Sequence, residues 1–278
     1  MAEEYLKKHF EGVVPSGAAP LCLPDELRSL ELRNQVRLAE YVTNFRRRYE
    51  GRDPLHVGVI LEMHRITVDD IYSSAGRFRD ATEDVIVPGA GFTPAAPSAI
   101  EYELVDLLDR ARFARAISHP LSLWERLEPP TRAFHRFLQI HPFLDGNGRV
   151  GRALLLLMLY DFGLLEPPEQ IFDFILVNRD RYLEVLKEAD QGPLAPLLGL
   201  MATPIQDWHL QRVLDELLRL PQGEIIFAEL GSEQQRLLDR AYRLTLSQDD
   251  SRSGYQQQID SLISKLSSII IDLANNLT

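Results

Sequence analysis

Apolar side chains recur at helical spacing along most of the chain. Intervals of three to four residues between them predict helices at 25–50, 57–72, 100–114, 121–127, 130–140, 168–176, 179–190, 204–218 and 232–246. Pro129 and Pro130 mark the start of the helix at 130–140, because proline suits a first helical turn. Residues 153–159 are apolar on every side, so the helix that contains them is expected to lie at the centre of an all-α fold.

One stretch between these helices has a different pattern. Residues 76–101 are rich in glycine and proline and contain a short β-favouring run, Val85, Ile86 and Val87. Such a composition is typical of loops and hairpins. The stretch is either a connector or an exposed edge that binds a partner.

The C-terminal part reads as an extension. The polar run 247–254 resembles a linker, and an apolar stripe at helical spacing follows it over 259–273. That last helix either docks on its own domain or serves dimerisation or partner binding. We therefore expect an N-terminal helical segment at 1–50, a core domain at 51–205 and a C-terminal helical extension at 206–278.

The composition indicates which kinds of molecule and which cellular compartment to expect. The chain has 278 residues and a formal charge of −11, which argues against a broad electrostatic grip on nucleic acid. Its single cysteine, Cys22, cannot form an intramolecular disulfide. The sequence has no signal-peptide pattern and no membrane-spanning stretch, so we expect a cytoplasmic protein with no membrane contact. Export as a secreted effector without a signal sequence stays open.

The segment from His141 to Arg152 stands apart because several chemically useful residues lie within twelve positions. Gly146 and Gly148 allow the backbone to approach a ligand closely. They immediately precede the predicted central helix, whose first N–H groups and dipole favour an anion such as a phosphate. The spacing therefore predicts an anion-binding loop at a helix start.

Charged and titratable side chains complete this loop. Asp145 offers a hard oxygen ligand for Mg²⁺, which commonly takes one or two protein carboxylates together with substrate phosphates. Arg149 and Arg152 lie three residues apart, so both can bind phosphate oxygens at one helix end. His141 can accept a proton near neutral pH. Together these residues predict phosphate transfer chemistry.

The same residues match the signature HxFx(D/E)GNGRxxR at every specified position, and on that basis the chain resembles the Fic family over about residues 45–205. The resemblance implies a Fic-type helical bundle with a short β-hairpin flap near the active site. The helix before the motif and the run around Val85 to Val87 are similar to these two features. Gly76–Arg79 resembles the short motif that precedes the family's flap.

The resemblance further implies a protein adenylyltransferase that moves AMP from ATP to a Tyr, Thr or Ser hydroxyl of a target protein and releases pyrophosphate. His141 would be the base, Asp145 would bind Mg²⁺, and Phe143 would pack into the core. The flap residues Val85, Ile86 and Val87 would dock the target by strand addition. The residues implied to bind nucleotide or phosphate are Gly146, Asn147, Gly148, Arg149, Arg152, Asn178 and Tyr182.

Other activities stay open at this point. Transfer of UMP, phosphocholine or phosphate, removal of AMP, and non-catalytic nucleotide binding would all use the same scaffold. Gly148 favours adenylylation, since phosphorylating relatives usually carry Lys there. Many relatives restrain themselves through the motif [S/T]xxxE[G/N], but Lys7 and Arg46 precede the pairs Glu11-Gly12 and Glu50-Gly51, and Asp272 is only a distant approximation. The chain is therefore expected to be unrestrained, or restrained by an inhibitory partner protein, self-association or a divergent helix.

Overall fold

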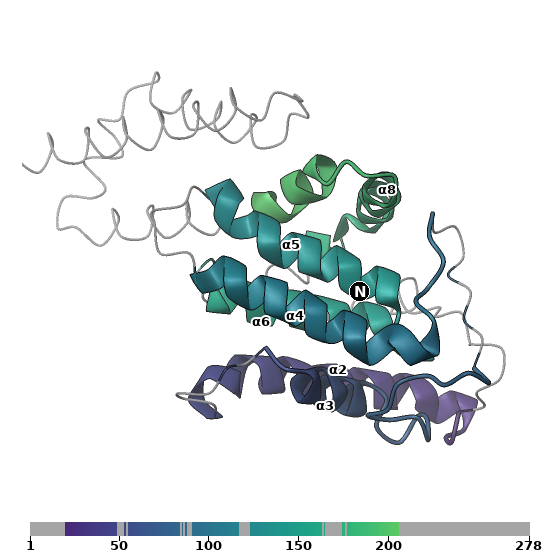
Figure 1. The fold of residues 1–278 in the computed structure, drawn as a ribbon. Coiled ribbons are helices and arrows are strands. Elements are labelled where there is room, and N and C mark those ends of the chain that lie inside the picture. The colour runs from purple at the N-terminus through teal and green to yellow at the C-terminus, as the bar shows by residue number, and fades with distance from the viewer. Residues whose placement is uncertain are drawn as a thin grey trace, which may run out of the picture. The chain divides into compact units, whose positions relative to one another are not determined.

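The computed structural model describes residues 20–48, 53, 55–83, 85, 87, 91–116, 123–162, 164, 174–175 and 177–205. The chain divides into two compact units, Met1–Met201 and Ala202–Thr278, and almost all described residues belong to the first. These residues contain helices and no strand, which confirms the all-α prediction (Figure 1). The elements are α2 (Pro24–Arg48), α3 (Val57–Thr67), the 3-10 turn η1 (Pro97–Ala99), α4 (Ile100–Ala116), α5 (Leu123–Ile140), α6 (Asn147–Asp161) and α8 (Arg179–Asp190), followed by helical residues at 195–205.

Helix α6 lies at the centre of the first unit, as its apolar sequence predicts. Every residue from Ala153 to Tyr160 is buried. Helices α2, α3 and α5 pack against α6, and α4 packs against α5. Figure 1 shows α2 and α3 on one side of α4, α5 and α6, with α8 on the other. Burial on all sides fixes the position of α6, and therefore the position of the loop that precedes it.

Helix α5 differs from the prediction of two separate helices. It runs unbroken from Leu123 to Ile140 with Pro129 and Pro130 inside it. Each proline removes one backbone hydrogen bond. However, Pro130 is itself buried, as are Leu127 and Thr131 nearby in the helix. Tertiary packing therefore holds this turn where local sequence preference predicts a break.

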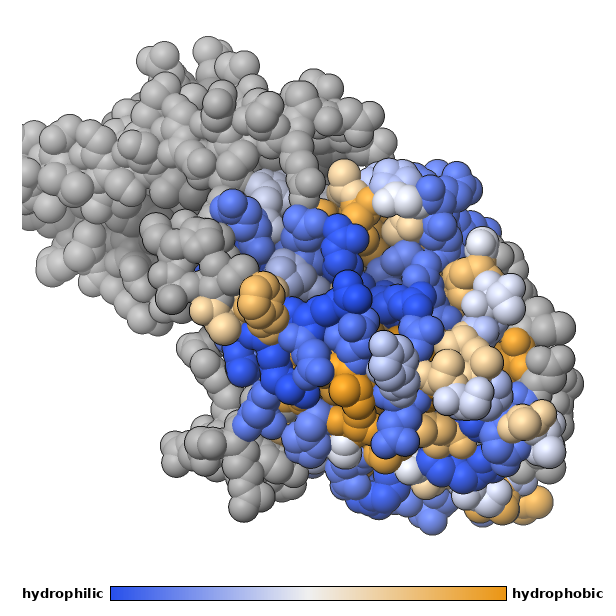
Figure 2. All heavy atoms as spheres, viewed as in Figure 1, coloured by the Kyte–Doolittle hydropathy of each residue, from blue (hydrophilic) through white to orange (hydrophobic). Residues whose placement is uncertain are grey.

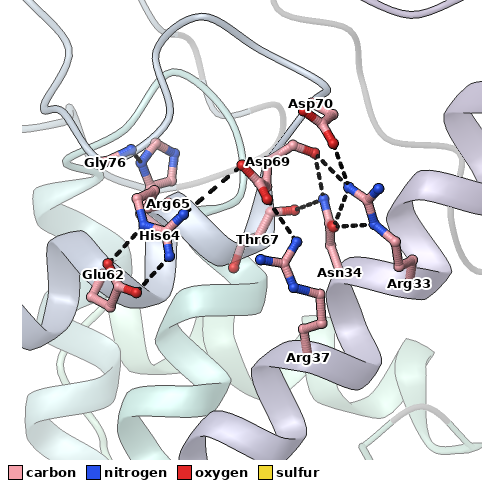
Figure 3. A network of polar contacts seen from close by, with 10 residues as sticks. All are labelled: Arg33, Asn34, Arg37, Glu62, His64, Arg65, Thr67, Asp69, Asp70 and Gly76. Atoms are coloured by element: carbon pink, nitrogen blue, oxygen red, sulfur yellow. Dashed lines mark hydrogen bonds and ion pairs between the residues drawn. The ribbon is translucent and has the colours of Figure 1, made fainter.

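Helix α3 is shorter than the predicted span of 57–72 because the chain turns sharply after Thr67. Asp70 adopts a left-handed backbone with φ of 61°. The buried Asn34 of α2 donates to the Asp69 carbonyl at 2.8 Å and to the Thr67 carbonyl at 3.4 Å, and Arg37 pairs with Asp69 at 2.6 Å. Figure 3 shows these contacts, which satisfy carbonyls at the end of α3 and fasten α2 to α3.

Several predicted features lie wholly or mostly outside the described residues. They are the helices at 168–176, 204–218 and 232–246, the linker 247–254, the stripe 259–273 and the three candidate restraint motifs. In the flap, Val85 and Val87 are described and belong to no strand, whereas Ile86 is outside, so the hairpin stays a prediction.

The described helices show no sign of a membrane span, since none combines the required length with sufficient apolar character. On the face shown in Figure 2, hydrophilic residues predominate and hydrophobic residues form separate small areas. Exposed apolar residues scattered in this way are normal for a protein surface.

Candidate active site

The loop between α5 and α6 turns through two left-handed residues. His141 has φ of 51° and Gly146 has φ of 81°. A left-handed backbone costs a non-glycine residue roughly 1–2 kcal/mol, so surrounding contacts must hold His141 in place. Gly146 caps α6, and its carbonyl accepts the Val150 N–H at 2.9 Å. The N–H groups of Asn147, Gly148 and Arg149 precede this first bond, so they have no acceptor within the helix and could face an anion.

Asn147 has a structural task that the sequence analysis did not foresee. Its side-chain amide accepts the Phe143 N–H at 2.9 Å and donates to the Phe143 carbonyl at 2.8 Å. The Asn147 side chain therefore closes the loop on itself. The backbone N–H of Asn147 lies at the start of α6 and could still face an anion.

Phe143 anchors the loop in the core, as the resemblance implies. It is fully buried, and its ring stacks on His64 with centroids 3.7 Å apart and planes 5° apart. The rings of Phe78 and Phe137 lie 5.8 and 6.4 Å away. This aromatic cluster fixes the middle of the loop against α3 and α5.

His64 of α3 supports the same loop. Its Nε2 lies 3.2 Å from the Asp145 carbonyl oxygen and its Nδ1 accepts the Gly76 N–H at 3.1 Å. A carbonyl can only accept, so Nε2 carries the proton and the ring is neutral. Burial is the main reason that its pKa falls to about 3, and the nearby Arg149 and Arg77 lower it further. His64 thus holds Asp145 from the side of α3.

This neutral histidine makes stability depend on pH. Between the unfolded pKa of 6.5 and the folded pKa of about 3, only the unfolded chain binds the proton, so stability falls as the pH falls. We expect His64 to reduce the free energy of unfolding by about 2 kcal/mol between pH 7.5 and pH 5.0. Urea unfolding at the two pH values measures the change, and His64→Gln should diminish it. An equal loss in this variant would contradict the assignment to His64.

His141 is also held in a defined protonation state. Its Nδ1 lies 3.2 Å from the Leu138 carbonyl oxygen, which requires the proton on Nδ1 and leaves Nε2 as the acceptor nitrogen of the neutral ring. Burial lowers the pKa of His141 to about 4. The Leu138 carbonyl and Asp145 act against this shift, whereas Arg79 adds to it. The imidazole is therefore unprotonated at neutral pH, as a general base must be.

Asp145 and Arg149 lie together at the start of α6. Their side chains pair at 2.7 Å, and Arg149 also pairs with Glu31 of α2 at 3.2 Å. Burial raises the pKa of Glu31, although Arg149 opposes the shift. Glu31 could not be predicted from the sequence, because nothing in the pattern of α2 indicates which residue meets the loop. A phosphate bound by Arg149 has to share this guanidinium with two carboxylates.

Arg152 contacts Tyr182, which the Fic resemblance implies to be a nucleotide-binding or phosphate-binding residue. It is hydrogen-bonded to Tyr182 of α8, and burial lowers the pKa of Arg152. A Cβ added at Gly148 would lie 3.4 Å from its NH1 atom. Asn178, one turn before Tyr182, donates to the Phe174 carbonyl at 2.8 Å. The structure thus brings Arg152, Gly148 and Tyr182 together, with Asn178 at the start of the same helix.

Asp145 also fits the donor chemistry of a magnesium site. Its side chain keeps 26% exposure and sits beside the anion-binding loop, which suits an ion held mainly by phosphate and water oxygens. The described residues contain no cluster of three or more His, Cys, Asp or Glu side chains that could bind a metal by themselves.

The described residues thus form a helical domain in which a glycine-containing loop and an unprotonated imidazole precede the central helix α6. Residues 54–159 match the family model described as Fic/DOC family. The chain therefore contains a Fic/DOC domain over these residues.

Similar proteins agree with this assignment. The chain is 31% identical over 147 residues to a probable protein adenylyltransferase of Aquifex aeolicus, covering 49% of this chain and 41% of the relative. It is 30% identical over 151 residues to protein adenylyltransferase fic-1 of Caenorhabditis elegans, covering 54% of this chain and 27% of the relative. These matches thus span less than half of either relative's length.

Solved structures support the fold. A fragment of Fic-1 from C. elegans superposes with a TM-score of 0.54 at 24% identity, covering 70% of this chain and 54% of that one. A Fic family protein from Desulfovibrio desulfuricans gives a TM-score of 0.50 at 21% identity, covering 76% and 60%. The described helices therefore adopt the Fic fold.

Proposed function

We propose that this protein is a protein adenylyltransferase, which transfers AMP from ATP to a Tyr, Thr or Ser hydroxyl of a target protein. The observation that carries the proposal is the state of His141: its Nδ1 is committed to the Leu138 carbonyl, so Nε2 is the nitrogen that can accept a proton beside the anion-binding loop. The names of the two relatives above point to the same reaction.

The reaction follows from the arrangement of these groups. The target hydroxyl oxygen forms a bond to the α-phosphorus, its proton moves to Nε2 of His141, and the bond to the β-phosphate breaks to release pyrophosphate. The N–H groups at the start of α6 and the guanidinium groups of Arg149 and Arg152 stabilise the charge on the phosphates. Asn178 and Tyr182 border the nucleoside.

Magnesium would bind to Asp145 and neutralise phosphate charge. Asp145 is positioned for this by His64 through its carbonyl and by Arg149 through its carboxylate. The carboxylate has a second oxygen in addition to the one that Arg149 occupies.

The remaining proposals concern partners and organisation. Val85, Ile86 and Val87 would form the flap that pairs with an extended target segment. Segment 1–50, core 51–205 and extension 206–278 would be the functional parts. We further propose a cytoplasmic location, no nucleic-acid partner, and restraint by another protein or by self-association if the activity is restrained.

Labelled ATP tests the proposed transfer. With Mg²⁺ and cell lysate, α-labelled ATP should label protein and γ-labelled ATP should not. Label from γ-labelled ATP alone would indicate phosphate transfer instead, whereas no label from either would favour a nucleotide-binding protein. A closely matched assay with labelled UTP separates AMP transfer from UMP transfer.

A further inference from the structure

The carbonyl groups at the end of α5 are bound by one buried arginine. The last carbonyls of a helix lack donor partners within the helix. Arg79 donates from Nε to the His141 carbonyl at 2.7 Å and from NH2 to the Ile140 carbonyl at 3.4 Å. Arg79 is only 6% exposed, so its guanidinium is committed to this helix end rather than to solvent.

The same arginine joins a second segment to this helix end. Its NH2 group donates to the Ala95 carbonyl, and the Ala95 N–H donates to the Ile140 carbonyl at 3.3 Å. The backbone N–H of Arg79 itself donates to the Pro142 carbonyl at 3.0 Å. Residues 79 and 95 therefore meet at the residues on either side of His141, although they lie sixteen positions apart in sequence.

The chain between these two residues is the stretch that contains Val85, Ile86 and Val87. Its later part has another fixed point, because the Gly91 N–H donates to the Asp190 carboxylate at 3.2 Å. That carboxylate is buried and also binds His135 at 2.8 Å. Residues 79, 91 and 95 thus attach this stretch to the helices, and among these described contacts Arg79 binds the carbonyl of the candidate base itself.

We propose that Arg79 is a positioning residue: it fixes the backbone of His141 and joins it to the base of the segment that docks the target. This inference rests on the proposed function, because it takes His141 as the base and the segment as the docking site. A guanidinium suits the task since its planar fork reaches several carbonyls at once, whereas an ammonium group is a single point of attachment.

Arg79 has an electrostatic effect on His141 as well. The charged groups that act on the imidazole are Arg79, from the segment after α3, and Asp145, from the same loop. Arg79 lowers the pKa of His141 and Asp145 raises it. Removing the positive charge should therefore raise the pKa of the imidazole, which a purely structural defect elsewhere would not do.

Two substitutions distinguish the role of the planar guanidinium fork of Arg79 from the role of its positive charge. Arg79→Lys keeps the charge and loses the fork, and Arg79→Gln loses both. We expect each to reduce kcat for AMP transfer about 10- to 100-fold and to leave the dissociation constant for Mg-ATP within about twofold. Only Arg79→Gln should move the acid limb of kcat/KM and the NMR titration of His141 to higher pH. Arg110→Gln, which removes an exposed arginine of α4 paired with Asp106, is the matched control and should change none of these quantities.

Wild-type kcat in both Arg79 variants, or an unchanged His141 titration in Arg79→Gln, would overturn the inference. If Arg79→Gln fails to fold, the kcat of Arg79→Lys tests the inference instead. A wild-type kcat in that variant would show that Arg79 does not position His141. If the unsubstituted protein labels no target, the proposed function fails, and the NMR titration then tests Arg79 by itself.

Discussion

His141→Ala is expected to reduce AMP transfer about 10²- to 10⁴-fold, the usual contribution of a general base. The loss should fall on kcat, because His141 accepts the proton of the attacking hydroxyl and is not among the residues proposed to hold the phosphates. Binding of Mg-ATP should therefore stay within a few-fold of the wild-type value. Initial rates of AMP incorporation and a binding titration measure the two effects.

His141→Asn is the variant that removes the base while tolerating the backbone. Asparagine adopts the left-handed region more readily than alanine, and His141 has φ of 51°. An equal loss in both variants would assign the effect to the imidazole. His56→Ala is the matched histidine control, since His56 precedes α3 without a side-chain capping bond. Transfer at the wild-type rate by either His141 variant would rule out its role as the base.

Gly146→Ala is expected to weaken both folding and nucleotide binding. Gly146 has φ of 81°, and a Cβ there would lie 3.2 Å from Cγ2 of Thr67 and 3.3 Å from Cγ1 of Val68. Left-handed strain and overpacking together should cost about 2–4 kcal/mol. Relief of the clash displaces the N–H groups at the start of α6, so we expect affinity for Mg-ATP to fall at least about tenfold. Urea unfolding and a binding titration measure the two losses.

Gly192→Ala separates backbone strain from damage to the loop. Gly192 has φ of 121°, and nothing lies within 4 Å of an added Cβ. This variant should lose stability through its backbone alone and keep its affinity for the nucleotide. Unchanged nucleotide affinity in Gly146→Ala would show that the start of α6 does not bind the phosphates.

Pattern and motif were sufficient to predict the class of fold and the central position of α6. The residues from Ala153 to Leu159 are apolar on every side of the helix, so they can all be buried only if other helices surround α6. The helix break at Pro129 was predicted wrongly. Proline removes a backbone hydrogen bond and so favours a break, but the sequence does not show the tertiary packing that offsets this loss. The end of α3 was misplaced for a similar reason, since Asn34 of a different helix satisfies its last carbonyls.

The motif also predicted which residues gather at the loop, but not what holds them. His64 and Arg79 bind backbone carbonyls of Asp145 and His141. Every residue has a backbone carbonyl, so the sequence does not indicate which ones are bound. Glu31 reaches Arg149 across 118 positions, a distance over which spacing rules give no information. The side-chain bonds of Asn147 to Phe143 were not predicted either, because a signature gives the residue type and not the role of each of its atoms.

The measurement that tests the central claim most directly is a crystal structure of the chain with Mg²⁺ and a non-hydrolysable ATP analogue. We predict phosphate oxygens within hydrogen-bond distance of the backbone N–H groups at the start of α6, with Nε2 of His141 facing the α-phosphorus. Phosphates bound elsewhere, or an imidazole whose Nε2 points away from them, would contradict the account.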